Sequence, residues 1–198
     1  MNVWIQEGVF HITYQTPSDL PPTLLQLADD YEGVIPHRVG WNLPLTSSAR
    51  RTLSTLFPAL APALSLSSAS APGSPSPSAS AAVAASVAAS ASASASAAAA
   101  VTYLIVYPAK DIQTKKHELL HARYAMDPTY RQQVMTLWKS LSLAHQTKVL
   151  RVLRDLQYPE REELLVDEFQ AYYFTEPSRF FGIPSYPLSP LSPKKKRK

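Results

Sequence analysis

Two histidines and a glutamate with helical spacing are the residues of this chain best suited to chemistry. They lie in Lys116-His117-Glu118-Leu119-Leu120-His121, an H-E-x-x-H motif in a run that can form a helix. Residues i and i+4 of a helix lie about 6 Å apart along the axis and about 40° apart around it, so both imidazoles face one way. Such a pair supplies two nitrogen ligands to one Zn²⁺, and the glutamate between them can hold and deprotonate a metal-bound water. A solvated helical face that carries two histidines is the simpler interpretation.

A third ligand would distinguish a zinc site from that simpler interpretation, and Glu168 is the first candidate. Residues 160–175 are predicted to form a helix, because they follow Pro159, begin with acidic side chains and stop before Pro177. Glu168 lies in the middle of the apolar stripe of this helix, which should face the core. Since burial of an unpaired charge is costly, a metal held by two histidines would stabilise the carboxylate there.

Residues 101–176 resemble the gluzincin zinc metallopeptidases in their minimal form. The resemblance rests on H-E-x-x-H and on Glu168-Phe169-Gln170-Ala171-Tyr172, which is similar to the Glu-x-x-Ala helix of that family but has tyrosine where a polar residue is usual. It implies an α+β fold in which a short mixed sheet packs on an active-site helix and a glutamate-bearing helix. It also implies Zn²⁺ ligated by His117, His121 and Glu168, with Glu118 as the catalytic base.

His145 is the alternative third ligand. Residues 128–158 are predicted to form two helices with a break near residues 140–145, and His145 lies in that break. A third histidine would instead be similar to the DNA-associated proteases of the SprT-like kind.

One strand is predicted just before the motif. Residues 101–107 are β-branched and aromatic and stop at Pro108. The resemblance implies that this strand lies at the sheet edge and pairs with extended substrate, whereas an ordinary core strand is the other interpretation. Near the N-terminus we expect two short strands around Glu7-Gly8 and a helix over residues 19–30.

Composition divides the chain into four parts. Residues 1–57 are assigned to the N-terminal part of the metallopeptidase-like domain and residues 101–183 to the zinc-binding core. Residues 58–100 are nearly all Ala, Ser and Pro, so they are assigned to a low-complexity insertion whose small side chains bury too little area to offset backbone ordering. Residues 184–198 are a Pro-rich and basic tail. The absence of cysteine excludes disulfides and thiolate metal sites.

The positive charge of the chain is concentrated at its C-terminus. A short cationic run after a Pro-rich stretch matches a nuclear localisation signal, which predicts nuclear import machinery as a partner and residence in the nucleus, or in nucleus and cytoplasm. A generic basic tail is the alternative. Charges interleave elsewhere, so nucleic acid is not expected outside the tail. No apolar run of about 20 residues and no signal peptide are present, so no membrane association is expected. The run consists of Lys194, Lys195, Lys196, Arg197 and Lys198.

These observations predict a zinc-dependent metallopeptidase that hydrolyses peptide bonds in a protein or peptide substrate. Glu118 would take the proton of the attacking water and pass it to the leaving amine. The alternative is a non-catalytic peptide- or protein-binding module that keeps the metalloprotease fold with an idle site.

Overall fold

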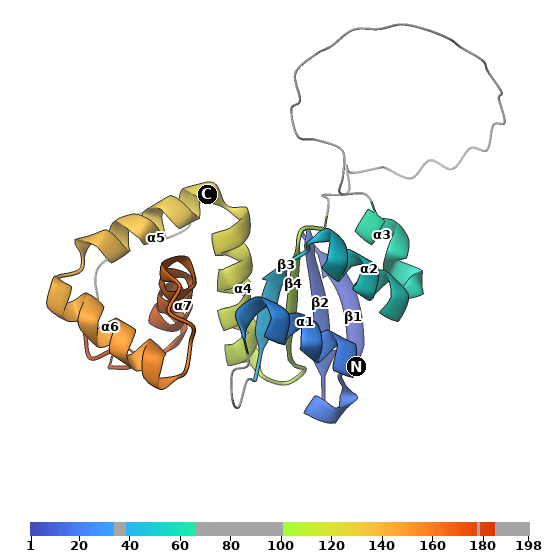
Figure 1. The fold of residues 1–198 in the computed structure, drawn as a ribbon, viewed down its shortest axis with the longest axis horizontal. Coiled ribbons are helices and arrows are strands. Elements are labelled where there is room, and N and C mark those ends of the chain that lie inside the picture. The colour runs from blue at the N-terminus through green and yellow to red at the C-terminus, as the bar shows by residue number, and fades with distance from the viewer. Residues whose placement is uncertain (34–38, 66–100, 178, 185–198) are drawn as a thin grey trace, which may run out of the picture.

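The fold is α+β, with a small mixed sheet between two groups of helices. The computed structural model describes residues 1–33, 39–65, 101–177 and 179–184, and within these it contains four strands and seven α-helices (Figure 1). This confirms the expected fold class. The helices are α1 (Pro22–Glu32), α2 (Ser47–Leu56), α3 (Ala61–Ser65), α4 (Ile112–Met126), α5 (Pro128–Ser140), α6 (Leu143–Asp155) and α7 (Glu162–Thr175).

The sheet joins strands from both halves of the chain. Its order is β1 (Asn2–Gln6), β2 (Val9–Tyr14), β4 (Tyr103–Pro108) and β3 (Trp41–Pro44). β1 and β2 form the expected antiparallel hairpin, β2 pairs with β4 in parallel, and β3 pairs with β4 in antiparallel orientation. All six residues of β2 are buried, because helices cover both faces of the sheet.

Each face of the sheet has its own apolar cluster. Phe10, Ile12 and Leu104 pack on one face with side chains from α1, α2 and α3. Tyr103 and Ile105 point to the other face, where they meet Ala122 of α4. A third cluster fills the space between α4, α5, α6 and α7. Helix α4 therefore lies between the sheet and the group α5–α7 (Figure 1).

The strand next to the motif is not an edge strand. β4 has neighbours on both sides, and the edge position that the resemblance implied for residues 101–107 is therefore wrong. β3 occupies that edge instead, and it was missed in the sequence. The alternation of Trp41, Leu43 and Leu45, all buried, is the period-two signal that could have revealed it.

The helical part before the low-complexity stretch extends further than expected. Residues 58–60 form a 3-10 helix and α3 follows, inside the range 58–100 assigned to the insertion. Leu64 of α3 is only 1% exposed. The Arg50 guanidinium donates to the carbonyls of Leu45, Leu64 and Val101, so it binds the chain on both sides of residues 66–100. The remainder of the range and the tail 185–198 lie outside the described residues.

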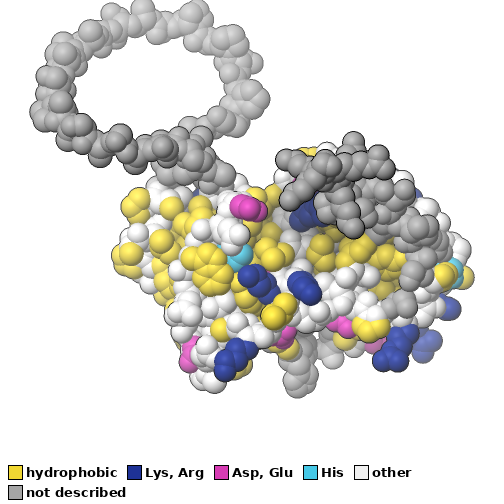
Figure 2. Space-filling model, turned by 180° about the vertical axis from the view of Figure 1, so that it is seen from behind, with side chains coloured by type: hydrophobic (Ala, Val, Ile, Leu, Met, Phe, Trp, Pro, Cys, Tyr) yellow, Lys and Arg dark blue, Asp and Glu magenta, His cyan; other side chains and the backbone are white. Residues whose placement is uncertain are grey.

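The other helix predictions are confirmed within a few residues. α5 and α6 flank a break at residues 141–142, and α7 begins two residues later than expected. No helix in the described ranges is both long and apolar enough to cross a membrane. On the face seen in Figure 2, Lys and Arg side chains form small separate groups with apolar and acidic surface between them.

Replacement of Leu64 by alanine should lower the free energy of unfolding by about 2–5 kcal/mol, because it leaves a cavity in the α2–α3 side of the core. Urea unfolding of the purified protein measures this. Leu143→Ala is the matched control, since Leu143 is 78% exposed and its truncation should change stability by less than about 0.5 kcal/mol. Equal effects of the two substitutions would show that α3 is not part of the folded domain.

Candidate metal centre

Helices α4 and α7 bring the three predicted ligands together. His117 and His121 lie one turn apart on α4, and Glu168 faces them from α7, which packs along α4. Their three ligand atoms lie within 4.8 Å of one another. Among the described residues, His145 does not belong to this group, so Glu168 is the third side chain that the fold supplies.

The three donor atoms form a triangle suited to a metal ion. His117 Nε2 and His121 Nε2 are 3.1 Å apart, and each lies 3.6 Å from Oε2 of Glu168. The centre of a triangle with these sides is about 2.0 Å from each corner, and bonds from divalent ions such as zinc to imidazole and carboxylate are about 2.0–2.2 Å long. A metal ion therefore fits between the donor atoms without rearrangement of α4 or α7.

A hydrogen bond between His117 and Thr175 directs the lone pair of His117 Nε2 at the centre of the triangle. Its Nδ1 lies 3.4 Å from Thr175 Oγ1. The Thr175 hydroxyl donates its own proton to the carbonyl of Ala171, so it accepts from His117. With the proton on Nδ1, Nε2 carries the lone pair that a metal requires.

Asp167 orients His121 in the way that Thr175 orients His117. Its Oδ1 lies 2.9 Å from His121 Nδ1 and favours the proton on that nitrogen. Gln170 donates to Asp167 and accepts from the phenol of Tyr130, so side chains from α4, α5 and α7 are connected behind the site. Asp127, which also lies close to the motif in the sequence, instead caps α5 by accepting from Tyr130 N.

Buried negative charge makes the centre attractive to a cation. Burial alone lowers the pKa of His121, but the carboxylates of Asp167 and Glu168 outweigh it and raise that pKa well above its ordinary value. Burial raises the pKa of Glu168, and the adjacent His121 and His117 outweigh it and lower that pKa. Glu168 is 3% exposed, and within the described residues its Oε2 has no hydrogen-bond partner. A metal ion would satisfy this oxygen.

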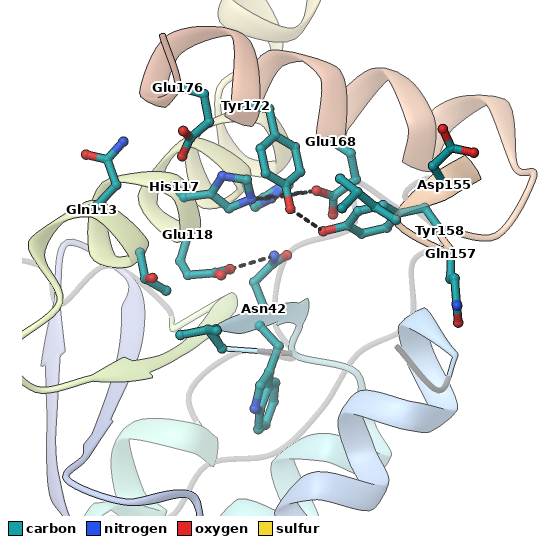
Figure 3. A pocket seen from close by; sticks show the side chains of 16 residues that line it. Asn42, Gln113, His117, Glu118, Asp155, Gln157, Tyr158, Glu168, Tyr172 and Glu176 are labelled. Carbon is teal, nitrogen blue, oxygen red and sulfur yellow. Dashed lines mark hydrogen bonds and ion pairs between the residues drawn. The ribbon is translucent and has the colours of Figure 1, made fainter. Parts of the chain in front are cut away.

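The same three donors open onto a pocket of about 420 Å³, which Glu118 also lines (Figure 3). Glu118 is buried and accepts a hydrogen bond of 2.9 Å from Nδ2 of Asn42 on β3. Residues 39–42 form one wall of the pocket, and residues 155–158, after α6, lie at another. A carboxylate, three side chains that could hold a metal ion and space for a small molecule or peptide thus meet in one cavity.

Two tyrosines border the ligands. The Tyr172 ring meets His117 edge to face at 4.5 Å between centroids, and its hydroxyl lies 3.0 Å from that of Tyr158. Burial and the Glu168 carboxylate raise the pKa of Tyr158, so its phenol keeps its proton. Tyr158 is a residue of the pocket that no sequence pattern indicated. Tyr158 follows Gln157, whose φ of 67° turns the chain into the pocket after α6.

Comparison with known proteins identifies no relative: no protein-family model matches the chain, and neither a curated protein nor a solved structure matches it. The interpretation of the centre therefore rests on its own geometry.

The purified protein should hold about one divalent ion per chain, because three donors define one site. Elemental analysis should find the ion absent from His117→Ala and His121→Ala and much reduced in Glu168→Ala. His145→Ala is the control and should retain it. Retention in Glu168→Ala with loss in His145→Ala would transfer the third ligand to His145.

Asp167→Asn should weaken metal binding about 10- to 100-fold, because it removes the charge that orients and polarises His121. Competition with a chromophoric chelator measures the affinity. Asp155→Asn is the control, since Asp155 is a carboxylate that lines the same pocket. Equal affinities for the two variants would mean that Asp167 does not support the ligand.

Proposed function

We propose that this chain is a zinc-dependent metallopeptidase of the gluzincin kind that hydrolyses peptide bonds in protein or peptide substrates. The observation that carries the proposal is the placement of Glu118. It lies next to His117 in the sequence, and its carboxylate lines the same pocket as the three donor atoms. A site that only stored a metal would not need an additional carboxylate in that position.

Zinc is the metal that this ligand set favours. Two imidazoles and one carboxylate, with a position open to a pocket, are the ligands of catalytic zinc sites. The chain has no cysteine, so a site of thiolate ligands is excluded. When bound, Zn²⁺ supplies Lewis acidity that polarises a carbonyl group and lowers the pKa of water.

The residues of the chain then divide the remaining work. Glu118 takes a proton from the attacking water as the new carbon–oxygen bond forms, and it delivers that proton to the leaving nitrogen as the peptide bond breaks. Thr175 and Asp167 hold the protons of the two imidazoles at Nδ1. The phenols of Tyr158 and Tyr172, both lining the pocket, are placed to donate to the oxygen on which negative charge develops.

The pocket wall formed by β3 suits an extended polypeptide. β3 is the last strand of the described sheet, and residues 39–42 border the cavity. An extended peptide can pair its main chain with such an edge while its side chains enter the pocket. This assigns to β3 the substrate-aligning position that the sequence had suggested for residues 101–107.

Nuclear residence is also part of the proposal, and it rests on sequence alone. The run Lys194–Lys198 lies outside the described residues. The nucleus, or nucleus and cytoplasm, would then be where the substrate is met.

Glu118→Gln should keep the fold and the zinc but reduce cleavage about 10²- to 10⁴-fold, because glutamine accepts from Asn42 but cannot take a proton. A library of fluorescence-quenched peptides provides the assay. Glu160→Gln is the control, since Glu160 is exposed and pairs with Arg154 at 2.7 Å.

Cleavage by Glu118→Gln at the wild-type rate, or no cleavage of any peptide by zinc-loaded wild type, would contradict the proposal. Binding without cleavage would favour the non-catalytic peptide-binding alternative.

A further inference from the structure

Strand β3 and the residue just before it present two unusual residues to helix α4. Along this edge the side chains alternate, so Trp41 and Leu43 enter the apolar cluster on the α1–α3 side of the sheet. Gly40 and Asn42 fall on the opposite side, facing α4. A position between a sheet and a helix normally favours an apolar side chain, because a buried amide is costly unless both of its ends are hydrogen-bonded.

Asn42 meets that condition through Glu118 and Tyr103. The Asn42 side chain is 5% exposed, and its Nδ2 donates to Oε2 of Glu118 at 2.9 Å. A carboxylate only accepts, so the NH₂ end of the amide must face Glu118. The other end, Oδ1, then accepts from the Tyr103 hydroxyl on the neighbouring strand β4. Tyr103, Asn42 and Glu118 therefore form a chain of hydrogen bonds with one defined direction.

Gly40 brings the strand close to the second oxygen of the same carboxylate. A Cβ atom at this position would lie 2.4 Å from Oε1 of Glu118 and 2.4 Å from Cγ2 of Thr114. Such contacts are far inside van der Waals distance, so any larger residue would push β3 away from α4 or displace Glu118. Asn42 and Gly40 thus both lie against the carboxylate of Glu118.

We propose that Asn42, held by Tyr103, is a positioning residue that fixes the carboxylate of Glu118 for its work as a base. The inference rests on the proposed function. A glutamate on a helix has three rotatable bonds, and a base that must meet one water needs most of that freedom removed. The bond from Asn42 orients one oxygen, and the close approach at Gly40 limits where the other can go.

The chain offers a matched pair of tyrosines for the test. Tyr103 and Tyr107 are both on β4 and both 2% exposed. Since their positions are an even number of residues apart, their side chains point to the same face of the sheet. The Tyr107 hydroxyl contacts His11 at 3.4 Å and takes no part in the hydrogen bonds to Glu118. Removal of each hydroxyl costs a similar buried contact, but only Tyr103→Phe removes the support of Asn42.

The first measurement is steady-state cleavage of a quenched peptide by zinc-loaded protein. Asn42→Ala should lower kcat about 10- to 100-fold with little change in KM and zinc content. Tyr103→Phe should lower kcat by less, and Tyr107→Phe should behave as wild type. In a Glu118→Gln background, Asn42→Ala should cause no further loss, because there is no base left to position. An unchanged kcat, an equal loss in Tyr107→Phe, or a further loss in that background would overturn the proposal.

The second measurement needs no activity. The NMR signal of the Asn42 side-chain amide, observed with ¹⁵N labelling in the zinc-loaded protein, should shift in Glu118→Ala and in Tyr103→Phe but not in Tyr107→Phe. An amide signal that ignores Glu118→Ala would show that Asn42 does not hold the carboxylate. If wild type cleaves no peptide while these shifts occur, the proposed function fails and the hydrogen-bonded chain stands.

Discussion

The burial of three carboxylates and two imidazoles around α4 is the constraint on which the rest of the structure depends. Glu118 and Glu168 are almost fully buried, and Asp167 contacts His121 directly behind them. Charges of one sign do not stay buried together without compensation. A divalent cation at the centre of the donor triangle would provide that compensation, and it would link α4 to α7.

The sheet contributes to the site through its edge. β4 supplies the rigid centre, with Tyr103 pointing towards α4, and β3 brings Gly40 and Asn42 to the Glu118 carboxylate. Loops that follow helices supply the opposite wall, where Tyr158 comes in from the turn after α6. The three donor side chains thus lie on two packed helices, while Glu118, the proposed base, is held by a residue of a strand. In the proposed mechanism, the elements that hold the metal differ from the element that orients the proton acceptor.

The sequence predicted the three donor residues but not the residues that orient the side chains of the site. Helical spacing predicts that His117 and His121 face one way, and the apolar stripe of its helix predicts that Glu168 faces the core. Both patterns are local in the sequence, so they can be recognised without the structure. Asp167, Asn42, Gly40 and Tyr158 act through contacts between elements far apart in the chain, and no local pattern marks them. The strand order illustrates the same limit: residues 101–107 were predicted to form a strand, but only the pairing with β2 and β3 shows that β4 is central.

Arg50 has a consequence for how this chain tolerates change in length. One guanidinium binds the carbonyls of Leu64 and Val101, so the described residues on the two sides of 66–100 are held within the span of a single side chain. The entropy of closing a loop grows only slowly with its length. Changes in the length or composition of the stretch between these two residues should therefore leave β4 in place. A reporter protein inserted there should likewise leave the centre between α4 and α7 intact.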